Sequence, residues 1–180
     1  MLLALVGVTG VGKSYFVNKI CNELNFKKVN TIRTREPRKG ESTQFFMSEE
    51  ELDKLYDEGK IAYKFRVFDG EYGYLKDEIF SEDNYIFEMH YTTIYDWKKV
   101  RPDIKTIYIL PSCLEKAKEQ TLHRNLSKEK EAERLEEIEE HYHTITTNKE
   151  LRNQFDYVIE NNYDEESTKK IIQLVQSILE

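Results

Sequence analysis

Residues 7–14 read Gly-Val-Thr-Gly-Val-Gly-Lys-Ser, and this octapeptide constrains the chain more than any other stretch. It matches the pattern G-x-x-x-x-G-K-[ST] of the P-loop. The apolar run Leu2–Val6 precedes it, and residues 15–20 follow it with helical spacing. A strand, a glycine-rich loop and a helix in this order are the context that the motif requires, so we expect the loop to bind a polyphosphate.

The parts of the motif have separate physical roles. The glycines let successive backbone N–H groups turn toward one concavity, and the helix that begins near Lys13 adds its positive dipole end. Lys13 is expected to reach the β- and γ-phosphates, and the Ser14 hydroxyl to ligate Mg²⁺. The residues expected to bind ATP are Gly7, Val8, Thr9, Gly10, Val11, Gly12, Lys13 and Ser14. A glycine-rich turn without a ligand is the alternative, and the correct flanks argue against it.

Composition excludes several classes of protein. The chain has 180 residues, 39% apolar and 34% charged, which suits one globular domain. Its net charge of −7 argues against nonspecific nucleic-acid binding. The first apolar run is too short for a signal peptide, and no apolar stretch approaches the ~20 residues of a membrane span. The presence of only two cysteines fits a reducing compartment. We therefore expect a cytoplasmic domain with no nucleic-acid or membrane partner, and the sequence gives no oligomeric state.

Apolar strands alternate with helices along the chain. Strands are expected at 2–6, 28–32, 85–88, 106–110 and 155–159. Helices are expected at 13–24, 92–100 and 164–179, and a further long helix is expected to end at about residue 147. This alternation predicts a three-layer α/β fold with a mostly parallel five-stranded sheet. A helix at 49–57 and a hairpin around Asp69-Gly70 predict a small α/β insertion at 31–75. Ligands of such folds gather at the C-terminal ends of the strands.

Two charged segments and one carboxylate follow expected strand ends. Four of the nine residues at 33–41 are basic, and Arg35 and Arg38 suit a phosphate, although a solvated loop has the same composition. Glu88 ends a strand and could hold Mg²⁺ or its waters, or be an ordinary strand-end acid. Arg124 and Arg134 flank a polar break at 125–130, which suits a mobile lid or a solvated helix face.

Four further segments carry a family resemblance. Residues 34–41 resemble a T-R-x-P-R-x-G-E segment, residues 70–73 a G-x-x-Y-G segment, residues 107–112 a strand ending in P-P-S, and residues 157–161 a late V-I-x-N strand. With the P-loop, they make nearly the whole chain resemble the guanylate kinase family. The resemblance implies a P-loop kinase fold with a core (1–30, 76–122 and 148–180), a nucleoside-monophosphate-binding (NMP-binding) insertion (about 31–75) and a helical lid (about 123–147). It also implies transfer of the ATP γ-phosphoryl group to GMP.

The resemblance also implies roles for individual residues. Those that would hold the acceptor phosphate are Thr31, Arg35, Arg38 and Tyr72. Arg124 and Arg134 would be lid arginines that meet the phosphates on closure, and Asn161 would lie near the adenine of ATP. Glu88 falls where the family usually has an aspartate.

This sequence departs from the family at positions that contact the acceptor base or the phosphates. A guanine-reading glutamate falls on Lys64, a serine on Tyr74 and a second acid on His90. A tyrosine that contacts the acceptor phosphate falls near Gln44, and the first lid arginine falls on Gln120. Guanine presents donors at N1 and N2, and a charged lysine has only donors. We therefore predict that GMP is a poor acceptor and that a base rich in acceptors, such as a pyrimidine, suits Lys64 and His90 better.

The sequence thus favours an ATP-dependent nucleoside monophosphate kinase that uses Mg²⁺. A nucleotide-binding or interaction module without kinase activity is one alternative, favoured by the altered base pocket and opposed by the intact Lys13-Ser14 pair. A kinase for a non-nucleotide phosphate ester is another.

Overall fold

A five-stranded sheet forms the centre of the computed structural model, which describes residues 1–37, 43–67, 70–122 and 128–180. The strand order is β2-β6-β1-β7-β8, and each neighbouring pair is parallel. The strands are β1 (Leu2–Val6), β2 (Lys27–Lys28), β6 (Tyr85–Glu88), β7 (Lys105–Pro111) and β8 (Tyr157–Asn161). The expected parallel sheet is therefore confirmed, with the strand before the P-loop at its middle.

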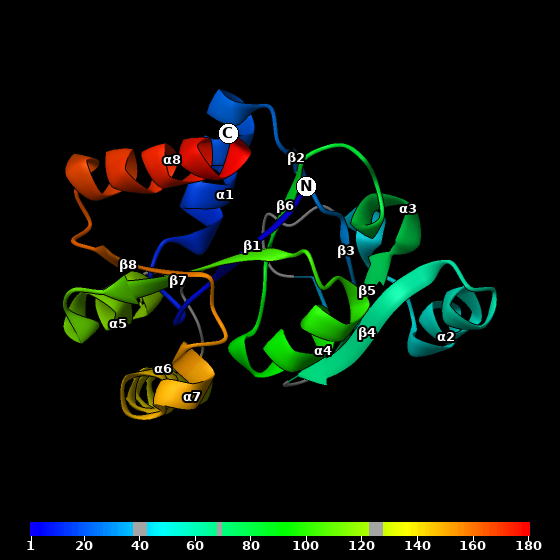
Figure 1. Ribbon diagram of the computed structural model, residues 1–180. Helices are drawn as coiled ribbons and strands as arrows, with labels where there is room; N and C mark the ends of the chain where they lie inside the picture. The colour runs from blue at the N-terminus through cyan, green and yellow to red at the C-terminus, as the bar shows by residue number, and fades with distance from the viewer. Residues whose placement is uncertain (38–42, 68–69, 123–127) are drawn as a thin grey trace.

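Helices cover both faces of this sheet (Figure 1). They are α1 (Lys13–Leu24), α3 (Lys76–Ile79), α4 (Ile94–Val100), α5 (Leu114–Leu122), α6 (Lys128–Thr147), α7 (Lys149–Arg152) and α8 (Glu165–Leu179). Leu3 and Leu5 of β1 pack into a core with α1 and α8. Leu2 and Ala4 point the other way, into a core with α4, α6 and α7. Because a strand with two buried faces needs a layer on each side, the result is a three-layer α/β fold.

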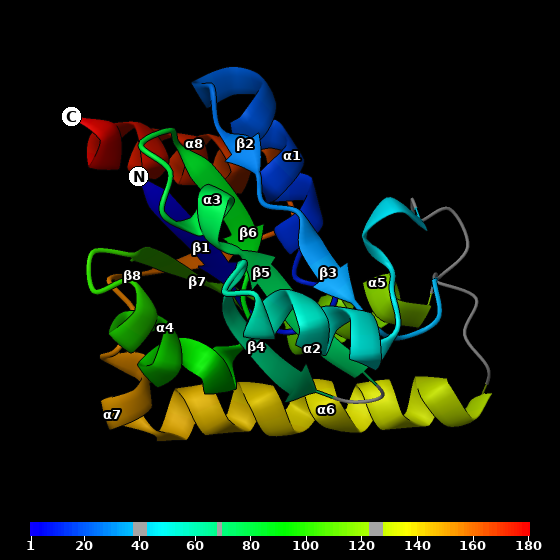
Figure 2. The same ribbon diagram turned by 90° about the vertical axis from the view of Figure 1, so that its right-hand side faces the viewer.

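A second, smaller sheet lies beside the first one (Figure 2). It is antiparallel, in the order β3-β5-β4, and its strands are β3 (Thr31–Arg33), β4 (Ile61–Val67) and β5 (Gly70–Leu75). The 3₁₀ turn η1 (Thr43–Phe45) and the helix α2 (Glu49–Asp57) complete this unit. Ser48 and Glu51 form a capping box at the start of α2, which is why the helix begins where the sequence predicts it.

Several element boundaries differ from expectation. The strand expected at 28–32 is two strands in different sheets, because the chain crosses between the sheets at Val29 and Asn30. Asn30 is held at the crossing by Glu78 of α3, whose carboxylate accepts from the Asn30 backbone N–H at 2.7 Å. The hairpin pairs Val67 with Gly70, whereas Gly70 was expected in the turn. The last strand begins at residue 157 rather than 155.

The charged segment expected to be a lid contains one long helix. α6 runs for 20 residues and ends at Thr147, the end that the sequence predicts. Figure 2 shows it passing beneath both sheets.

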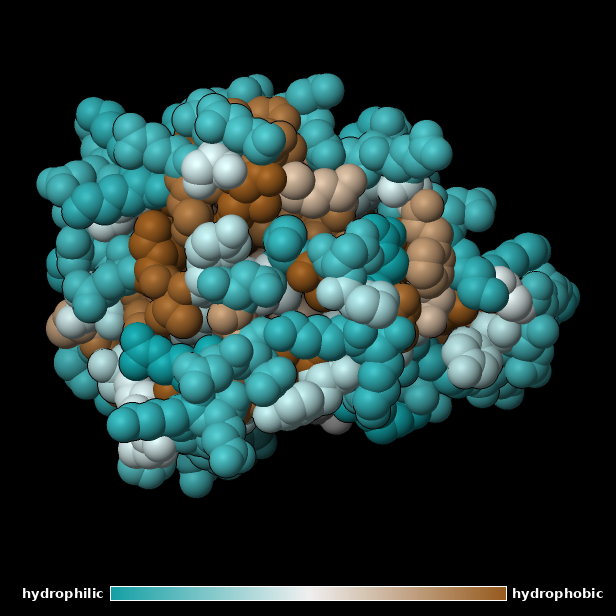
Figure 3. Space-filling view, viewed as in Figure 1, coloured by the Kyte–Doolittle hydropathy of each residue, from teal (hydrophilic) through white to brown (hydrophobic). Residues whose placement is uncertain are grey.

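The molecular face in Figure 3 is mostly hydrophilic, with hydrophobic patches between the elements. Among the helices that the structure describes, none combines the length and the apolar character that crossing a membrane requires.

Candidate active site

The P-loop joins the C-terminal end of β1 to the start of α1 in a backbone conformation that needs glycine. Gly10 has a φ of +83° and Gly12 a φ of +92°. A Cβ atom on Gly10 would lie 2.0 Å from the carbonyl oxygen of Ala117 in α5, so no larger residue fits. On its other side the loop is tied to β8, because Asn161 donates from Nδ2 to the Val11 carbonyl at 3.0 Å. The loop shape is thus fixed by two neighbouring elements.

Lys13, the first residue of α1, folds back over the loop. Its Nζ atom donates to the carbonyl oxygens of Gly7 and Val8 at 2.7 and 3.0 Å. Gly12 occupies the N-cap position and offers the helix no side-chain cap. Helix N–H groups without such a cap, together with an ammonium group beside them, are the donors that a phosphate anion needs.

Ser14 and Glu88 meet although 74 residues separate them in the chain. The Ser14 hydroxyl donates to Oε1 of Glu88 at 2.7 Å. The sheet brings them together, since Glu88 ends β6 and is paired with Leu5 of β1, two residues before the P-loop. A hydroxyl and a carboxylate are oxygen donors of the kind that Mg²⁺ prefers.

Asn161 was expected near the adenine of ATP. It is 3% exposed and its amide serves the backbone around it. Nδ2 holds Val11 of the P-loop, and Oδ1 accepts from the Tyr163 N–H at 2.8 Å. Asn161 therefore lies at the P-loop, and its contact with adenine stays a prediction.

Arg35, which was expected to hold the acceptor phosphate, is a buried arginine. Arg35 is only 8% exposed, and its Nε donates to the Tyr72 hydroxyl at 3.3 Å. Its Nη1 donates to the Glu36 carbonyl at 2.9 Å, and its guanidinium lies 5.3 Å from the centre of the Phe46 ring. A guanidinium that is withdrawn from water and ordered by these contacts is suited to binding an oxyanion.

The other described residues expected on the acceptor side lie on separate elements. Thr31 is paired with Tyr74 across β3 and β5, and Gln44 is exposed on η1. Arg38 and Arg124 lie outside the described residues, so their predicted phosphate contacts stay predictions. Gln120, at the position of the first lid arginine, is exposed on α5.

One face of the small sheet is built from stacked aromatic rings, and we call it the aromatic face: Tyr63, Phe65, Tyr72 and Tyr74. The ring centres of Phe65 and Tyr72 are 5.5 Å apart, and those of Tyr63 and Phe65 are 5.7 Å apart. Tyr74 is 2% exposed and contacts Trp97 of α4 edge-on at 4.8 Å, and burial raises its pKa. Tyr63, Phe65 and Tyr72 are half-buried. The face therefore joins the small sheet to the core and leaves three of its rings partly open.

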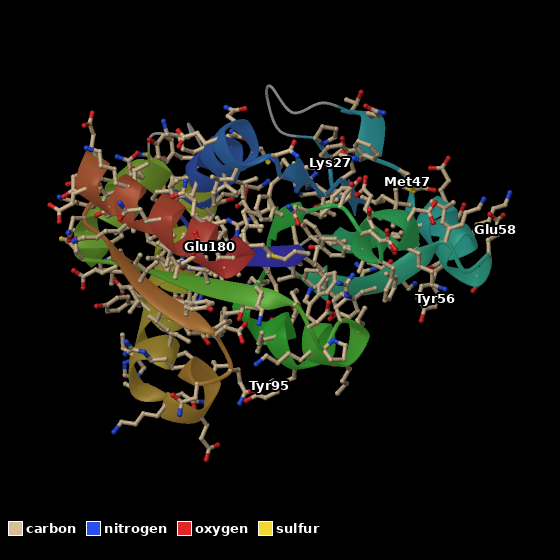
Figure 4. All side chains as sticks on the ribbon, turned by 45° about the horizontal axis from the view of Figure 1, so that its top comes forward. Lys27, Met47, Tyr56, Glu58, Tyr95 and Glu180 are labelled. Carbon is tan, nitrogen blue, oxygen red and sulfur yellow. The ribbon has the colours of Figure 1, made fainter. Side chains whose placement is uncertain are left out.

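Lys64 points away from this face, which corrects the expectation that it reads the acceptor base beside Tyr74. Successive side chains of a strand alternate between faces, and Lys64 follows Tyr63 in β4. Its Nζ forms an ion pair with Asp53 and lies 5.0 Å from the centre of the Tyr56 ring, both on α2. Figure 4 labels Tyr56 on the outer side of the small sheet. This arrangement therefore gives no support to the prediction that Lys64 rejects guanine, because the structure does not place Lys64 with Tyr72 and Tyr74.

His90 follows β6 and lies among cations. Its Nδ1 atom is 2.7 Å from the Thr92 hydroxyl. Burial, and then the charges of Lys13 and Arg134, lower the pKa of His90 to about 4. The imidazole is therefore neutral at pH 7. Because the charges of Lys13 and Arg134 both act on His90, the P-loop, the end of β6 and α6 lie close enough to interact. Arg134 also pairs with Glu137 at 2.6 Å.

Sequence reasoning missed a buried contact next to this group. His141 of α6 is 4% exposed, and its Nε2 lies 2.8 Å from the Tyr108 hydroxyl of β7. The Tyr91 ring stacks on His141 at 3.8 Å. Burial, followed by Lys13 and His90, lowers the pKa of His141 to about 2. The available signal was the spacing of His141 with Ile138 and Ile145, which marks the inner face of α6.

The described part of the chain holds no group of three or more His, Cys, Asp and Glu side chains arranged for a metal ion. Ser14 and Glu88 stay the predicted magnesium ligands. The described candidate residues are thus a P-loop with its lysine, an oxygen pair beside it, a buried arginine that follows β3 of the small sheet and a further arginine on α6.

The comparisons with known proteins agree with one another. A family model described as guanylate kinase matches residues 1–178. Similar proteins include the guanylate kinase of Mycoplasma mobile, 28% identical over 185 residues that cover 94% of this chain and 89% of the relative. Another is the guanylate kinase of Clostridioides difficile, 27% identical over 190 residues that cover 98% and 87%.

A solved structure gives the same answer for the fold. The crystal structure of guanylate kinase from Anaplasma phagocytophilum matches with a TM-score of 0.72 at 22% identity. The match covers 98% of this chain and 85% of the other. It confirms the P-loop kinase fold.

Proposed function

The chain belongs to the guanylate kinase family, and from that premise we propose that it transfers the γ-phosphoryl group of ATP to a nucleoside monophosphate. Family membership makes it a phosphotransferase of the nucleoside monophosphate kinase type. The observation that carries the proposal is the arrangement around the P-loop. Lys13 lies over the loop, and Ser14 contacts Glu88 of the neighbouring strand at 2.7 Å. Phosphoryl transfer depends on positioning and charge neutralisation, which is what these groups supply.

On the donor side, the P-loop N–H groups and Lys13 would hold the triphosphate of ATP. Ser14 and Glu88 fit Mg²⁺, because both supply oxygen atoms and the sheet already places them in contact. A magnesium ion bound there would neutralise charge on the β- and γ-phosphates. Asn161 would act mainly by keeping the loop in shape through its bond to Val11.

On the acceptor side, the small sheet would bind the monophosphate. Arg35 and Tyr72 would hold its phosphate, because the guanidinium is buried, oriented and bonded to the phenol at 3.3 Å. Thr31, Gln44 and Arg38 stay proposed members of this group. Arg134 would approach from α6, where its charge already acts on His90 beside the P-loop. In this proposal the small sheet is the NMP-binding insertion, and α6 with residues 123–127 is the lid.

We place the acceptor base on the aromatic face. The half-buried rings of Tyr63, Phe65 and Tyr72 offer flat apolar surface next to Arg35. Aromatic stacking suits any planar base, so it gives less discrimination between bases than a set of buried hydrogen bonds. Tyr74 and His90, which replace readers of guanine in the family pattern, stay proposed contributors at the edge of this surface.

A matched pair of variants tests this placement. Phe65→Leu should raise the KM for the acceptor about 10-fold, because a stacked ring is lost. Lys64→Ala, the next residue but on the opposite face, should leave the acceptor KM unchanged. If Lys64→Ala instead improves GMP as an acceptor, the base lies against Lys64 and our placement is wrong.

The activity itself is tested by coupled ADP release from Mg–ATP with GMP, dTMP, UMP and CMP as acceptors. We expect turnover with at least one of them. Binding of ATP without transfer to any nucleotide or other phosphate ester would show a binding module and contradict the proposal.

A further inference from the structure

The inner face of α6 carries an arginine at one end and a buried anchor further along. Arg134, Ile138, His141 and Ile145 are spaced by four, three and four residues, so they share one face of the helix. Ile138, His141 and Ile145 are 0, 4 and 1% exposed, whereas the Arg134 side chain is 21% exposed. The anchored part of α6 therefore lies on the C-terminal side of Arg134.

The anchor contains a directional contact as well as apolar packing. The Tyr108 hydroxyl of β7 and Nε2 of His141 form a buried hydrogen bond of 2.8 Å. Apolar side chains tolerate rotation and sliding, but a buried hydrogen bond does not, since a shift of α6 would leave both polar groups unpaired. This contact therefore fixes both the rotation of α6 about its axis and its position along that axis.

A second contact joins the same imidazole to the strand end that carries Glu88. The Tyr91 ring stacks on His141 at 3.8 Å and 21°, and Tyr91 also lies 4.9 Å from His90. Tyr91 begins the 3₁₀ turn η2 (Tyr91–Thr93), three residues after Glu88. His141 is thus held between β7 and the segment that follows β6.

We propose that His141, held by Tyr108 and Tyr91, is a positioning residue that aims Arg134 at the phosphates bound by the P-loop. The proposal rests on the proposed function, in which Arg134 acts on the transferring group. Arg134 precedes His141 by seven residues, or about 10 Å along the helix axis. A tilt of about 6° at the anchor would move the backbone at residue 134 by about 1 Å, and displacements of that size can cost about 100-fold in rate.

His141→Phe is the direct test, since it keeps a flat ring against Tyr91 and removes the hydrogen bond. We expect kcat to fall about 10- to 100-fold while the KM for Mg–ATP changes less than about twofold. His143→Phe is the matched control, because His143 is exposed on the same helix, and it should leave kcat unchanged.

A double variant separates positioning from general damage to the fold. If His141 acts through Arg134, then His141→Phe should change kcat less than about twofold when Arg134 is already alanine. An equal loss of kcat in both backgrounds would overturn the proposal. If His141→Phe does not fold, Tyr108→Phe removes only the hydroxyl and takes its place in the same comparison.

Hydrogen exchange gives a readout that does not depend on turnover. His141→Phe should speed amide exchange over residues 128–137 of α6, and His143→Phe should not. Unchanged exchange in that segment would overturn the positioning role. If the wild-type protein transfers no phosphoryl group, the proposed function fails by itself, and the exchange experiment still decides whether His141 holds α6.

Discussion

Lys13 and Ser14 are neighbours in the chain, yet their side chains find different partners. Lys13 turns back onto the carbonyls of Gly7 and Val8, whereas Ser14 reaches Glu88 of the adjacent strand. The motif predicted both residues and their roles. The contact with Glu88 depends on β6 lying next to β1, so at the scale of a residue the site combines a local pattern with the order of the strands.

Replacing Lys13 with alanine should lower kcat/KM by at least about 100-fold, because the ammonium group stabilises charge on the transferring phosphate. Lys19→Ala is the control, since Lys19 lies on the same helix and forms an ion pair with Glu23 at 2.8 Å. Coupled ADP release measures the rate, and circular dichroism checks the fold. A Lys13→Ala protein that turns over normally would remove the P-loop from the mechanism.

Removing Mg²⁺ with EDTA should abolish turnover, and Glu88→Gln should raise the Mg²⁺ concentration for half-maximal rate about 10- to 100-fold. The reason is that the amide oxygen carries no charge toward the cation. Glu82→Gln, exposed just before the same strand, should not change the requirement. Equal Mg²⁺ titrations for the two variants would exclude Glu88 from the metal site.

At the scale of elements, apolar patterns predicted β1, β6, α1 and α2 well, because each has a local signal. The split of residues 28–32 has no such signal. Lys28 pairs with Ile86 and Thr31 with Tyr74, so the break is decided by partners more than 40 residues away. The same limit applies to Lys64. A resemblance transfers its position in the chain, but only the packing of α2 shows toward which side of the sheet it points.

The contact between the P-loop and α5 predicts the result of two glycine substitutions. Gly59→Ala should cost about 1–2 kcal/mol, because φ is +72° and its surroundings are open. Gly10→Ala has a similar φ and also meets a backbone oxygen, so it should cost about 1–3 kcal/mol more. Urea unfolding measures both free energies. Equal costs would mean that the loop and α5 separate easily.

At the scale of the whole molecule, one buried and one partly buried imidazole tie stability to pH. The pKa of His141 is lowered to about 2 in the folded protein, and that of His90 to about 4, against an ordinary value of about 6.5. Below pH 6.5 the unfolded chain therefore binds protons that the folded protein does not. Stability is retained above about pH 6.5 and lost as the pH falls below it.

His141 should contribute about 1.4 kcal/mol per pH unit to this loss between pH 6 and pH 4. His141→Phe should flatten the dependence of the unfolding free energy on pH by that amount, whereas His143→Phe should keep it. Denaturant unfolding at half-unit steps measures the two slopes. Parallel curves for wild type and His141→Phe would show that His141 takes up its proton without unfolding.

The chain contains a single tryptophan, and it lies directly behind the aromatic face. Trp97 is fully buried, 5.0 Å from the Tyr63 ring and 4.8 Å from the Tyr74 ring. The tryptophan fluorescence of the unlabelled protein therefore originates at one place. A nucleotide base that settles against Tyr63 would alter the emission of that indole, so acceptor binding becomes visible as an optical signal separate from events at the P-loop.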